Sequence, residues 1–109
     1  MWVRGCAESE LEPGGAIRIE IDDIPVAVVM DSAGRCFAIG DTCSHADFSL
    51  SEGDVDGVEI ECWGHGAKFD VTSGEALSLP AVDRVPVYRV DVADGVVWVD
   101  TSVLVGAGQ

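Results

Sequence analysis

The fold of this chain is decided by the stretch VDGVEIECWGH, residues 55–65. Apolar and acidic residues alternate in it from Val58 to Cys62, and a period of two is typical of a strand with one buried face. Asp56-Gly57 stands just before this strand, between two valines, and is a strong signal for a two-residue hairpin turn. The stretch therefore predicts an antiparallel hairpin that leads directly into Cys62-Trp63-Gly64-His65.

The same period and similar turn signals recur along the rest of the chain. Isoleucines alternate with charged residues over 17–22, and the alternation over 85–92 changes phase once, which predicts a bulge near Val87. Asp94-Gly95 predicts a further turn. No long stretch shows a helical apolar stripe, and at most one helical turn is expected around 48–51. The pattern predicts an all-β fold, a small sandwich or barrel of short antiparallel strands.

Length and composition limit the chain to one small globular unit. It has 109 residues, of which 48% are hydrophobic and 24% are charged. We therefore expect a single domain over 1–109, folded around a core of its own. This length leaves no room for the catalytic domain of an oxygenase or a dehydrogenase beside another module.

The charge is strongly acidic, with 6 Lys+Arg against 20 Asp+Glu and a formal net charge of −14. Such a surface repels phosphate backbones and anionic membranes, so we expect no nucleic-acid or membrane partner and favour proteins with basic patches. The longest apolar run, 24–30, is too short to span a membrane, and the first residues lack the apolar segment of a secretory signal. The sequence therefore predicts a cytoplasmic protein. In a cytoplasmic protein, four cysteines indicate metal ligands or free thiols rather than disulfides.

Two short motifs contain the residues suited to metal chemistry. They are Cys43-Ser44-His45 and Cys62-Trp63-Gly64-His65, with sixteen residues between His45 and Cys62. The chain has only two histidines, and both belong to these motifs. Each motif lies in a loop region beside predicted strands, so two loop tips can meet and offer two thiolates and two imidazoles to one site. The candidate metal ligands are therefore Cys43, His45, Cys62 and His65.

Two kinds of metal group suit this ligand set. Two cysteines and two histidines can hold a tetrahedral zinc ion. Zinc fingers, however, usually pair Cys with Cys and His with His, whereas each loop here provides one of each. The mixed order suits a [2Fe–2S] cluster in which one iron takes both sulfurs and the other takes both imidazoles. Cys6 and Cys36 lie in apolar strand contexts and are expected to be buried free thiols.

With these motifs the chain resembles the Rieske family, and within it the small Rieske-type ferredoxins of bacterial aromatic-ring-hydroxylating dioxygenase systems. The resemblance spans nearly the whole chain: Trp2-Val3, the two ligand motifs, Gly74-Glu75-Ala76, Pro80 and a closing hairpin. It implies a Rieske-like antiparallel β-sandwich or barrel with one [2Fe–2S] cluster. The cluster-binding subdomain of two loops would occupy approximately 41–82.

The resemblance also implies roles for individual residues. Cys43 and Cys62 would bind the inner iron, His45 and His65 would bind the outer iron, and the third loop, 79–81, would cover the cluster. The protein would be a soluble one-electron carrier rather than an enzyme. It would pass electrons from a flavin-containing reductase to a terminal oxygenase in aromatic hydrocarbon catabolism. Both partners would bind transiently and present basic patches to the acidic surface.

Two positions depart from the respiratory branch of the family. Where that branch has a Ser and a Tyr whose hydroxyls donate hydrogen bonds to sulfur atoms, this chain has Ala67 and Phe69. Such hydrogen bonds stabilise the negative charge added on reduction, so their loss lowers the reduction potential. The resemblance therefore implies a potential at the low end of the Rieske range.

Two other functions stay open. The first is a small Rieske-like subunit of a nitrite reductase-type complex, which would be isolated as a permanent assembly rather than as a free monomer. The second is a structural zinc-binding interaction module. That protein would be colourless, whereas a Rieske ferredoxin is red-brown.

Overall fold

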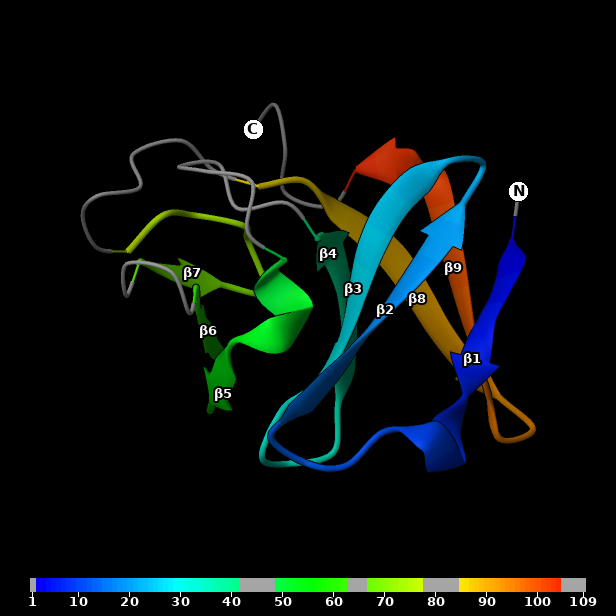
Figure 1. The fold of residues 1–109 in the computed structure, drawn as a ribbon. Helices are drawn as coiled ribbons and strands as arrows, with labels where there is room; N and C mark the ends of the chain where they lie inside the picture. The colour runs from blue at the N-terminus through cyan, green and yellow to red at the C-terminus, as the bar shows by residue number, and fades with distance from the viewer. Residues whose placement is uncertain (1, 42–48, 63–66, 78–84, 105–109) are drawn as a thin grey trace.

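The computed structural model describes residues 2–41, 49–62, 67–77 and 85–104, with the backbone alone for 103 and 104 (Figure 1). These ranges are mainly β, which confirms the all-β prediction. The strands are β1 (Val3–Ala7), β2 (Gly15–Ile21), β3 (Ile24–Met30), β4 (Cys36–Gly40), β5 (Asp54–Asp56), β6 (Glu59–Glu61), β7 (Lys68–Asp70), β8 (Val87–Ala93) and β9 (Val96–Leu104). Two short 3-10 helices are η1 (Glu8–Glu10) and η2 (Leu50–Glu52), and η2 overlaps the expected helical turn. Neither of these helices, the only ones in the described ranges, could cross a membrane.

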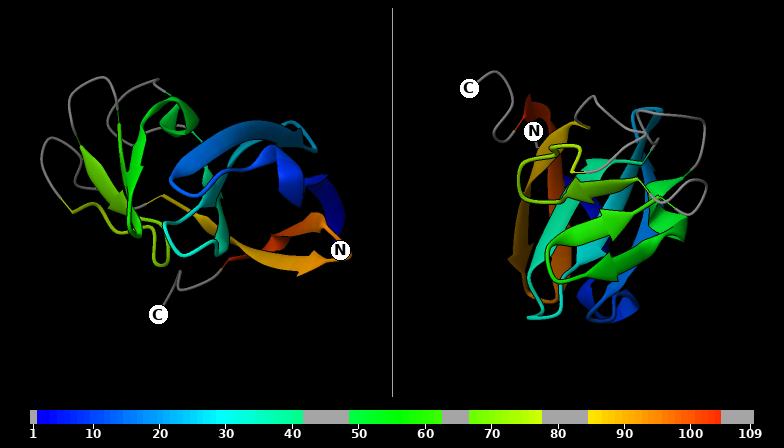
Figure 2. Two further views of the ribbon diagram at one scale, coloured as in Figure 1. Left: turned by 90° about the horizontal axis from the view of Figure 1, so that it is seen from below. Right: turned by 90° about the vertical axis from the view of Figure 1, so that its left-hand side faces the viewer.

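Six strands form one antiparallel sheet in the order β1-β9-β8-β4-β3-β2. The sheet curls until its end strands β1 and β2 lie near each other, which makes it a nearly closed barrel (Figures 1 and 2). Gly5 lies in this seam, where a Cβ atom would stand 3.2 Å from Cδ1 of Ile19. The β1–β9 register shifts between Arg4 and Cys6. Such an irregularity bends a strand, which helps a sheet to close.

The barrel encloses an apolar core to which all six strands contribute. Its buried members are Cys6, Leu11, Ile21, Val26, Val28, Met30, Ala38, Tyr88, Val97 and Val99. Cys6 is buried as expected, but Cys36 is only half-buried because it is the first residue of β4, directly after an exposed turn. Neither thiol forms a disulfide. Burial raises the pKa of both thiols, which favours the protonated form and makes them poor metal ligands.

Strand β3 is buried on both faces, which explains the continuous apolar run at 24–30. Val26 and Val28 belong to the barrel core, whereas Ala27 and Val29 belong to a second core outside the barrel wall. All four side chains are fully buried. One strand therefore separates the two cores and contributes to each of them.

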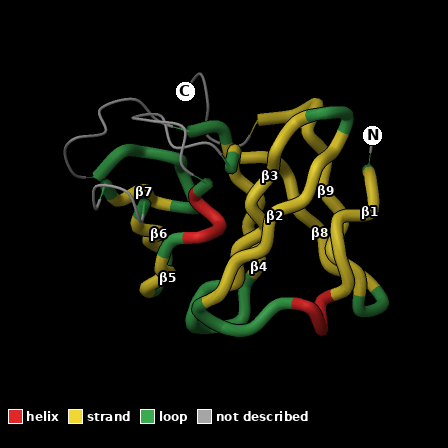
Figure 3. The backbone as a smooth tube through the Cα atoms, in the orientation of Figure 1, coloured by secondary structure: helices red, strands yellow, loops and turns green. Residues whose placement is uncertain are grey.

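The second core is covered by a small antiparallel sheet of strands β5, β6 and β7. Val55 pairs with Ile60, and Ile60 pairs with Phe69, so these three side chains share the face that packs on the second core. Figures 1 and 3 show the small sheet beside β3 and β4, with η2 between them. The barrel wall thus supports the strand that ends just before Cys62.

The β5–β6 hairpin differs from the sequence prediction by one residue. Asp56 pairs with Glu59, so the two loop residues are Gly57 and Val58 rather than Asp56 and Gly57. Gly57 has a φ of 61°, and a positive φ at the first loop position is what a type II′ hairpin turn requires. Val58 packs on the second core from the turn instead of from the strand.

The other predicted irregularities lie close to their expected places. Asp94 and Gly95 form the β8–β9 turn with φ values of 54° and 74°, the pair of positive values typical of a type I′ turn. The bulge expected near Val87 is a register shift between Tyr88 and Arg89. The alternation over 85–92 therefore located the bulge to within two residues.

Candidate metal centre

Of the four predicted ligands, Cys62 lies in the part of the chain that the structure describes. It follows β6 directly, and it is fully buried. Outside the described residues lie Cys43, His45, His65, Trp63 and Pro80. Within the described ranges, no three His, Cys, Asp or Glu side chains are grouped so as to hold a metal ion. Two connections contain the predicted ligands. The first ligand-bearing connection runs from Asp41 to Leu50, and the second runs from Cys62 to Ala67.

The second connection leaves and re-enters the small sheet at one hydrogen-bonded position. The Cys62 N–H donates to the carbonyl oxygen of Ala67 at 2.6 Å, one step beyond the pair of Glu61 and Lys68. Only residues 63–66 stand between these bonded residues, and they include His65. A connection of this length keeps His65 within reach of Cys62. Both members of the second motif therefore belong to one closed connection.

The first connection is closed by Asp41, which follows β4. Its backbone carbonyl accepts the N–H of Leu50 at 2.6 Å, and its Oδ1 atom accepts the N–H of Ser51 at 2.9 Å. Its own N–H donates to the carbonyl of Pro25 on β3. The residues between Asp41 and Leu50 include Cys43 and His45. Asp41 therefore joins the two ends of the first ligand-bearing connection and fixes them to the barrel wall.

The bases of the two connections meet in the second core. Leu50 of the first base, and Cys62 and Ala67 of the second, are fully buried members of that core. Gly53 makes the approach possible, because a Cβ atom there would overlap the carbonyl of Glu61. The chain after η2 therefore lies directly against β6. This contact brings together the bases of the two connections, which are far apart in sequence.

A third segment, which contains Pro80, leaves from the same region. The N–H of Leu77 donates to the Lys68 carbonyl at 2.7 Å, and the N–H of Val85 donates to the Gly74 carbonyl at 2.8 Å. Gly74 has a φ of 78°, and a Cβ atom there would overlap the carbonyl of Val85. A glycine is therefore required where the chain returns from 78–84 to the second core.

The environment of Cys62 suits an iron–sulfur group. Ala67 and Phe69 are fully buried in the same core, and neither side chain can donate a hydrogen bond. Each of the two motifs provides one Cys and one His to the predicted donor set. Such a set suits a cluster with sulfur ligands on one iron and nitrogen ligands on the other. The residues present therefore fit a [2Fe–2S] group.

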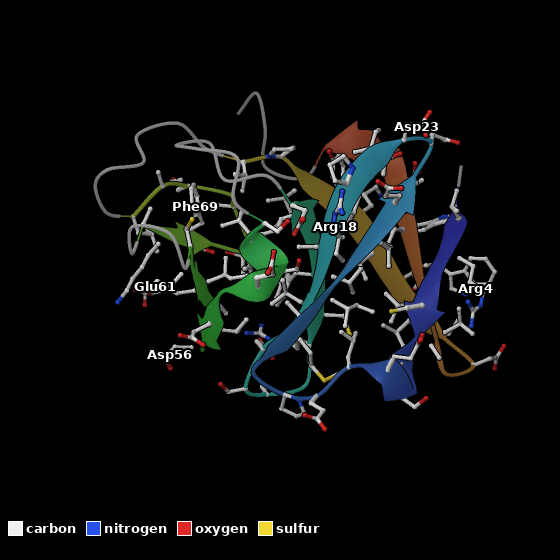
Figure 4. All side chains as sticks on the ribbon, in the orientation of Figure 1. Arg4, Arg18, Asp23, Asp56, Glu61 and Phe69 are labelled. Atoms are coloured by element: carbon white, nitrogen blue, oxygen red, sulfur yellow. The ribbon has the colours of Figure 1, made fainter. Side chains whose placement is uncertain are left out.

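The opposite face of the small sheet is acidic. Its outward carboxylates belong to Asp54, Asp56, Glu59 and Glu61, and Figure 4 shows Asp56 and Glu61 on the side away from the barrel. Lys68 is exposed on the same face, paired in register with Glu61. The negative potential of this face is close to the base of the second ligand-bearing connection. It favours approach by a positively charged surface.

Sequence reasoning did not single out Asp41, Leu50 or Gly53 as parts of this site. Asp41 carried one readable signal, since it is a carboxylate directly after an apolar strand and two residues before Cys43. Its buried state depends on partners in β2, β3 and η2, which no local pattern reveals. Gly53 matters only through its contact with β6.

Comparison with known proteins gives consistent results. A model of the Rieske [2Fe–2S] domain family matches residues 1–89. The sequence is 38% identical to ferredoxin CarAc of Metapseudomonas resinovorans over 91% of this chain and 92% of that protein. The structure matches the ferredoxin of carbazole 1,9a-dioxygenase from Nocardioides aromaticivorans IC177, with a TM-score of 0.86, 35% identity, and coverage of 91% and 96%. It also matches a chain in a complex of reduced oxygenase and oxidised ferredoxin in carbazole 1,9a-dioxygenase, with a TM-score of 0.82, 38% identity, and coverage of 90% and 91%.

Proposed function

The chain belongs to the Rieske [2Fe–2S] domain family, and on this premise we propose that it is a one-electron carrier, the ferredoxin component of a ring-hydroxylating oxygenase system. The observation that carries the proposal is the meeting of the bases of both connections in one buried core, of which Leu50, Cys62 and Ala67 are members. In this role the chain is an electron-transfer component and catalyses no reaction of its own. The protein binds the cofactor, sets its potential and presents a docking surface.

The proposed cofactor is one Rieske-type [2Fe–2S] cluster, which supplies the uptake and release of a single electron. Cys43 and Cys62 bind one iron, and His45 and His65 bind the other. The segment of approximately 41–82 is the cluster-binding part of a single domain over 1–109. The closed bases of the two connections support this assignment, because each base joins the ends of a segment that contains one Cys and one His.

Several residues of this chain act on the cluster without binding it. The apolar side chains of Ala67 and Phe69 exclude water from the neighbourhood of Cys62 and donate no hydrogen bond to sulfur. Hydroxyl groups at these two positions could stabilise the negative charge added on reduction, so the apolar side chains found there keep the potential lower than hydroxyl-bearing ones would. Leu50 and Asp41 hold the first connection against the same core.

The proposed partners are a flavin-containing reductase that donates the electron and a terminal oxygenase that accepts it. The structure of a related ferredoxin with the oxygenase of carbazole 1,9a-dioxygenase supports the oxygenase as a partner. The acidic face supports basic patches on both partners, which would accelerate encounter more than they would tighten the complex. We place the protein in the cytoplasm, where thiols such as those of Cys6 and Cys36 stay reduced.

The test of this proposal is the visible and electron paramagnetic resonance spectrum of the purified protein, before and after reduction with dithionite, with iron and sulfide analysis. We expect a red-brown protein with two irons and two sulfides per chain and a paramagnetic signal only after reduction. A colourless protein that contains zinc would establish the structural zinc module instead.

A second measurement separates a free carrier from a subunit of a nitrite reductase-type complex. Size-exclusion chromatography of the protein from its native cells should give a free ferredoxin that accepts electrons from a separately purified reductase. Isolation only as part of a permanent assembly with a reductase subunit would contradict the carrier role.

A further inference from the structure

We propose that Asp41 and Arg18 form a positioning pair that fixes the first ligand-bearing connection to the barrel and tunes the reduction potential of the cluster. The inference rests on the proposed function, because it takes Cys43 as a ligand to the inner iron. Asp41 lies two residues before Cys43, so their Cα atoms are at most about 7 Å apart. Neither Asp41 nor Arg18 belongs to the ligand set itself.

The contacts of Asp41 reach three separate segments of the chain, namely β2, β3 and η2. Oδ1 accepts the N–H of Ser51, while Oδ2 lies 3.2 Å from Nε of Arg18 on β2. The backbone of Asp41 bonds to Pro25 on β3 and to Leu50 in η2. One residue therefore connects two adjacent barrel strands to both ends of the connection that contains Cys43.

The two charges differ greatly in their exposure to water. The Asp41 side chain is 2% exposed, whereas that of Arg18 is 50% exposed and also reaches the exposed Glu20 at 3.3 Å. A buried carboxylate without a cationic partner is costly, so Arg18 offsets the burial of Asp41. Burial also reduces the screening of the Asp41 charge by water and salt, and its field therefore acts on nearby groups.

The sign of each effect on the potential follows from the charge change on reduction. Reduction adds one negative charge to the cluster, so a nearby negative charge lowers the potential and a nearby positive charge raises it. Replacing Asp41 with Asn removes a negative charge but keeps a side-chain oxygen that can accept the Ser51 N–H. Replacing Arg18 with Gln leaves the Asp41 charge uncompensated. The two variants should shift the potential in opposite directions.

The chain contains a matched control at the other end of β3. Asp31 is also a 2% exposed carboxylate paired with an exposed arginine, Arg35, at 2.9 Å, and its Oδ1 atom accepts two backbone N–H groups. It follows the last residue of β3, whereas Asp41 bonds near the first residues of that strand. A strand of seven residues separates the two ends by about 20 Å. Asp31 shares the local chemistry of Asp41 but lies far from the proposed cluster.

The experiment measures the reduction potential by protein-film voltammetry for wild type, Asp41→Asn, Arg18→Gln, the double variant, Asp31→Asn and Arg35→Gln. We expect Asp41→Asn to raise the potential, Arg18→Gln to lower it, and the double variant to lie close to wild type. Both variants of the control pair should keep the wild-type potential. Shifts of the same sign in the two single variants, equal shifts in the control pair, or no shift at all would overturn the tuning role.

The positioning role has its own readout, the rate at which a chelator removes iron from the oxidised protein. Asp41→Ala loses the acceptor for Ser51 and should release iron at least fivefold faster than wild type, whereas Asp41→Asn should restore most of the retention. Equal release rates for Asp41→Ala and wild type would overturn this role. A wild-type protein without a [2Fe–2S] cluster would instead refute the proposed function, so the two failures are distinguishable.

Discussion

The barrel and the small sheet differ in the length of their strands and in the source of their cores. Barrel strands are five to nine residues long and surround a core of their own, whereas each strand of the small sheet has three residues. The core under the small sheet is completed by Ala27, Val29 and Ile39 from the outer wall of the barrel. A small sheet is stable in water only if one of its faces is apolar and packed. The barrel can therefore serve as a folded support, and we expect the small sheet to depend on that support and on the metal group.

The barrel and the small sheet therefore have different roles: the barrel supports the fold, and the small sheet supports the candidate site. The barrel surrounds its core mainly with apolar side chains at alternate positions, and a glycine at position 5 allows its seam to close. The small sheet lies beside the candidate site, and the segments that flank its strands include positions that accept only glycine. Gly53 and Gly74 are such positions, because any side chain there would overlap a backbone carbonyl.

The largest expected effect comes from removing the metal group. Replacing Cys62, Cys43, His45 or His65 with Ala should abolish the cluster or deplete it severely, because each iron needs two protein ligands. Metal binding and folding are coupled at such sites, so amide exchange should accelerate in β5, β6 and β7 and stay slow in the barrel strands. Iron and sulfide analysis with hydrogen-exchange mass spectrometry would test this. A variant that keeps a full cluster, or uniform exchange in both sheets, would contradict the division proposed here.

Substitutions at two glycines test the same division between barrel and small sheet without changing any predicted ligand. Gly74 and Gly34 have φ values of 78° and 88°, but a Cβ at Gly74 overlaps the Val85 carbonyl, whereas a Cβ at Gly34 meets nothing within 4 Å. Gly34→Ala should cost about 1–2 kcal/mol for the left-handed backbone alone. Gly74→Ala should cost about 3 kcal/mol or more, in the range of severe single substitutions. Urea unfolding measures both; equal losses would show that the packing at Gly74 relaxes freely.

The potential should respond to the second core and not to the barrel core. Ala67→Ser with Phe69→Tyr places hydroxyls in the fully buried environment of Cys62. A hydrogen bond to sulfur that favours the reduced form by about 1 kcal/mol raises a one-electron potential by about 40 mV. The wild-type value should lie near the lower Rieske limit of roughly −150 mV. Protein-film voltammetry gives both values.

The matched control is Val28→Thr, which puts a hydroxyl into the barrel core at another fully buried position. It should reduce stability and leave the potential unchanged. A wild-type potential well above zero, or an unchanged potential in a well-folded double variant, would refute the role assigned to Ala67 and Phe69.

The smallest expected effect is a pH dependence that belongs to the barrel. Hydrogen bonds from the hydroxyl and N–H groups of Ser102 lower the pKa of Asp100 on β9 from 3.8 to about 2. A lowered folded-state pKa contributes stability above the unfolded value, and this contribution is lost as the pH falls from 3.8 to about 2. The stability difference between wild type and Asp100→Asn should therefore shrink over that interval, as measured by urea unfolding and circular dichroism. A difference independent of pH would exclude ionised Asp100 as its cause.

The sequence predicted what depends on local pattern. Alternation identified the strands around Ile17 and Ile60, the Asp94-Gly95 signal located a turn, and the two Cys/His motifs led to the Rieske family, which is confirmed. The position of the β5–β6 turn was wrong by one residue, because Gly57 takes the first loop position. Alternation alone does not fix which residue has a positive φ.

What the sequence did not predict depends on contacts between distant segments. The position of Asp41 after an apolar strand is visible in the sequence, but its contacts with Arg18, Pro25 and Ser51 form only in the folded chain. Likewise, the run 24–30 shows that a strand is apolar but does not show that it separates two cores. The ligand set of Cys43, His45, Cys62 and His65 stays a prediction that spectroscopy and substitution will test.

The short length of β5 has a consequence for the behaviour of the protein at high concentration. An edge strand presents backbone donors and acceptors to other chains, and this makes it a starting point for aggregation. Strand β5 lies at an end of the small sheet, has only three residues, and carries Asp54 and Asp56 on either side of Val55. A brief, doubly charged edge resists pairing with a second copy. Part of the acidic excess therefore protects the protein against self-association.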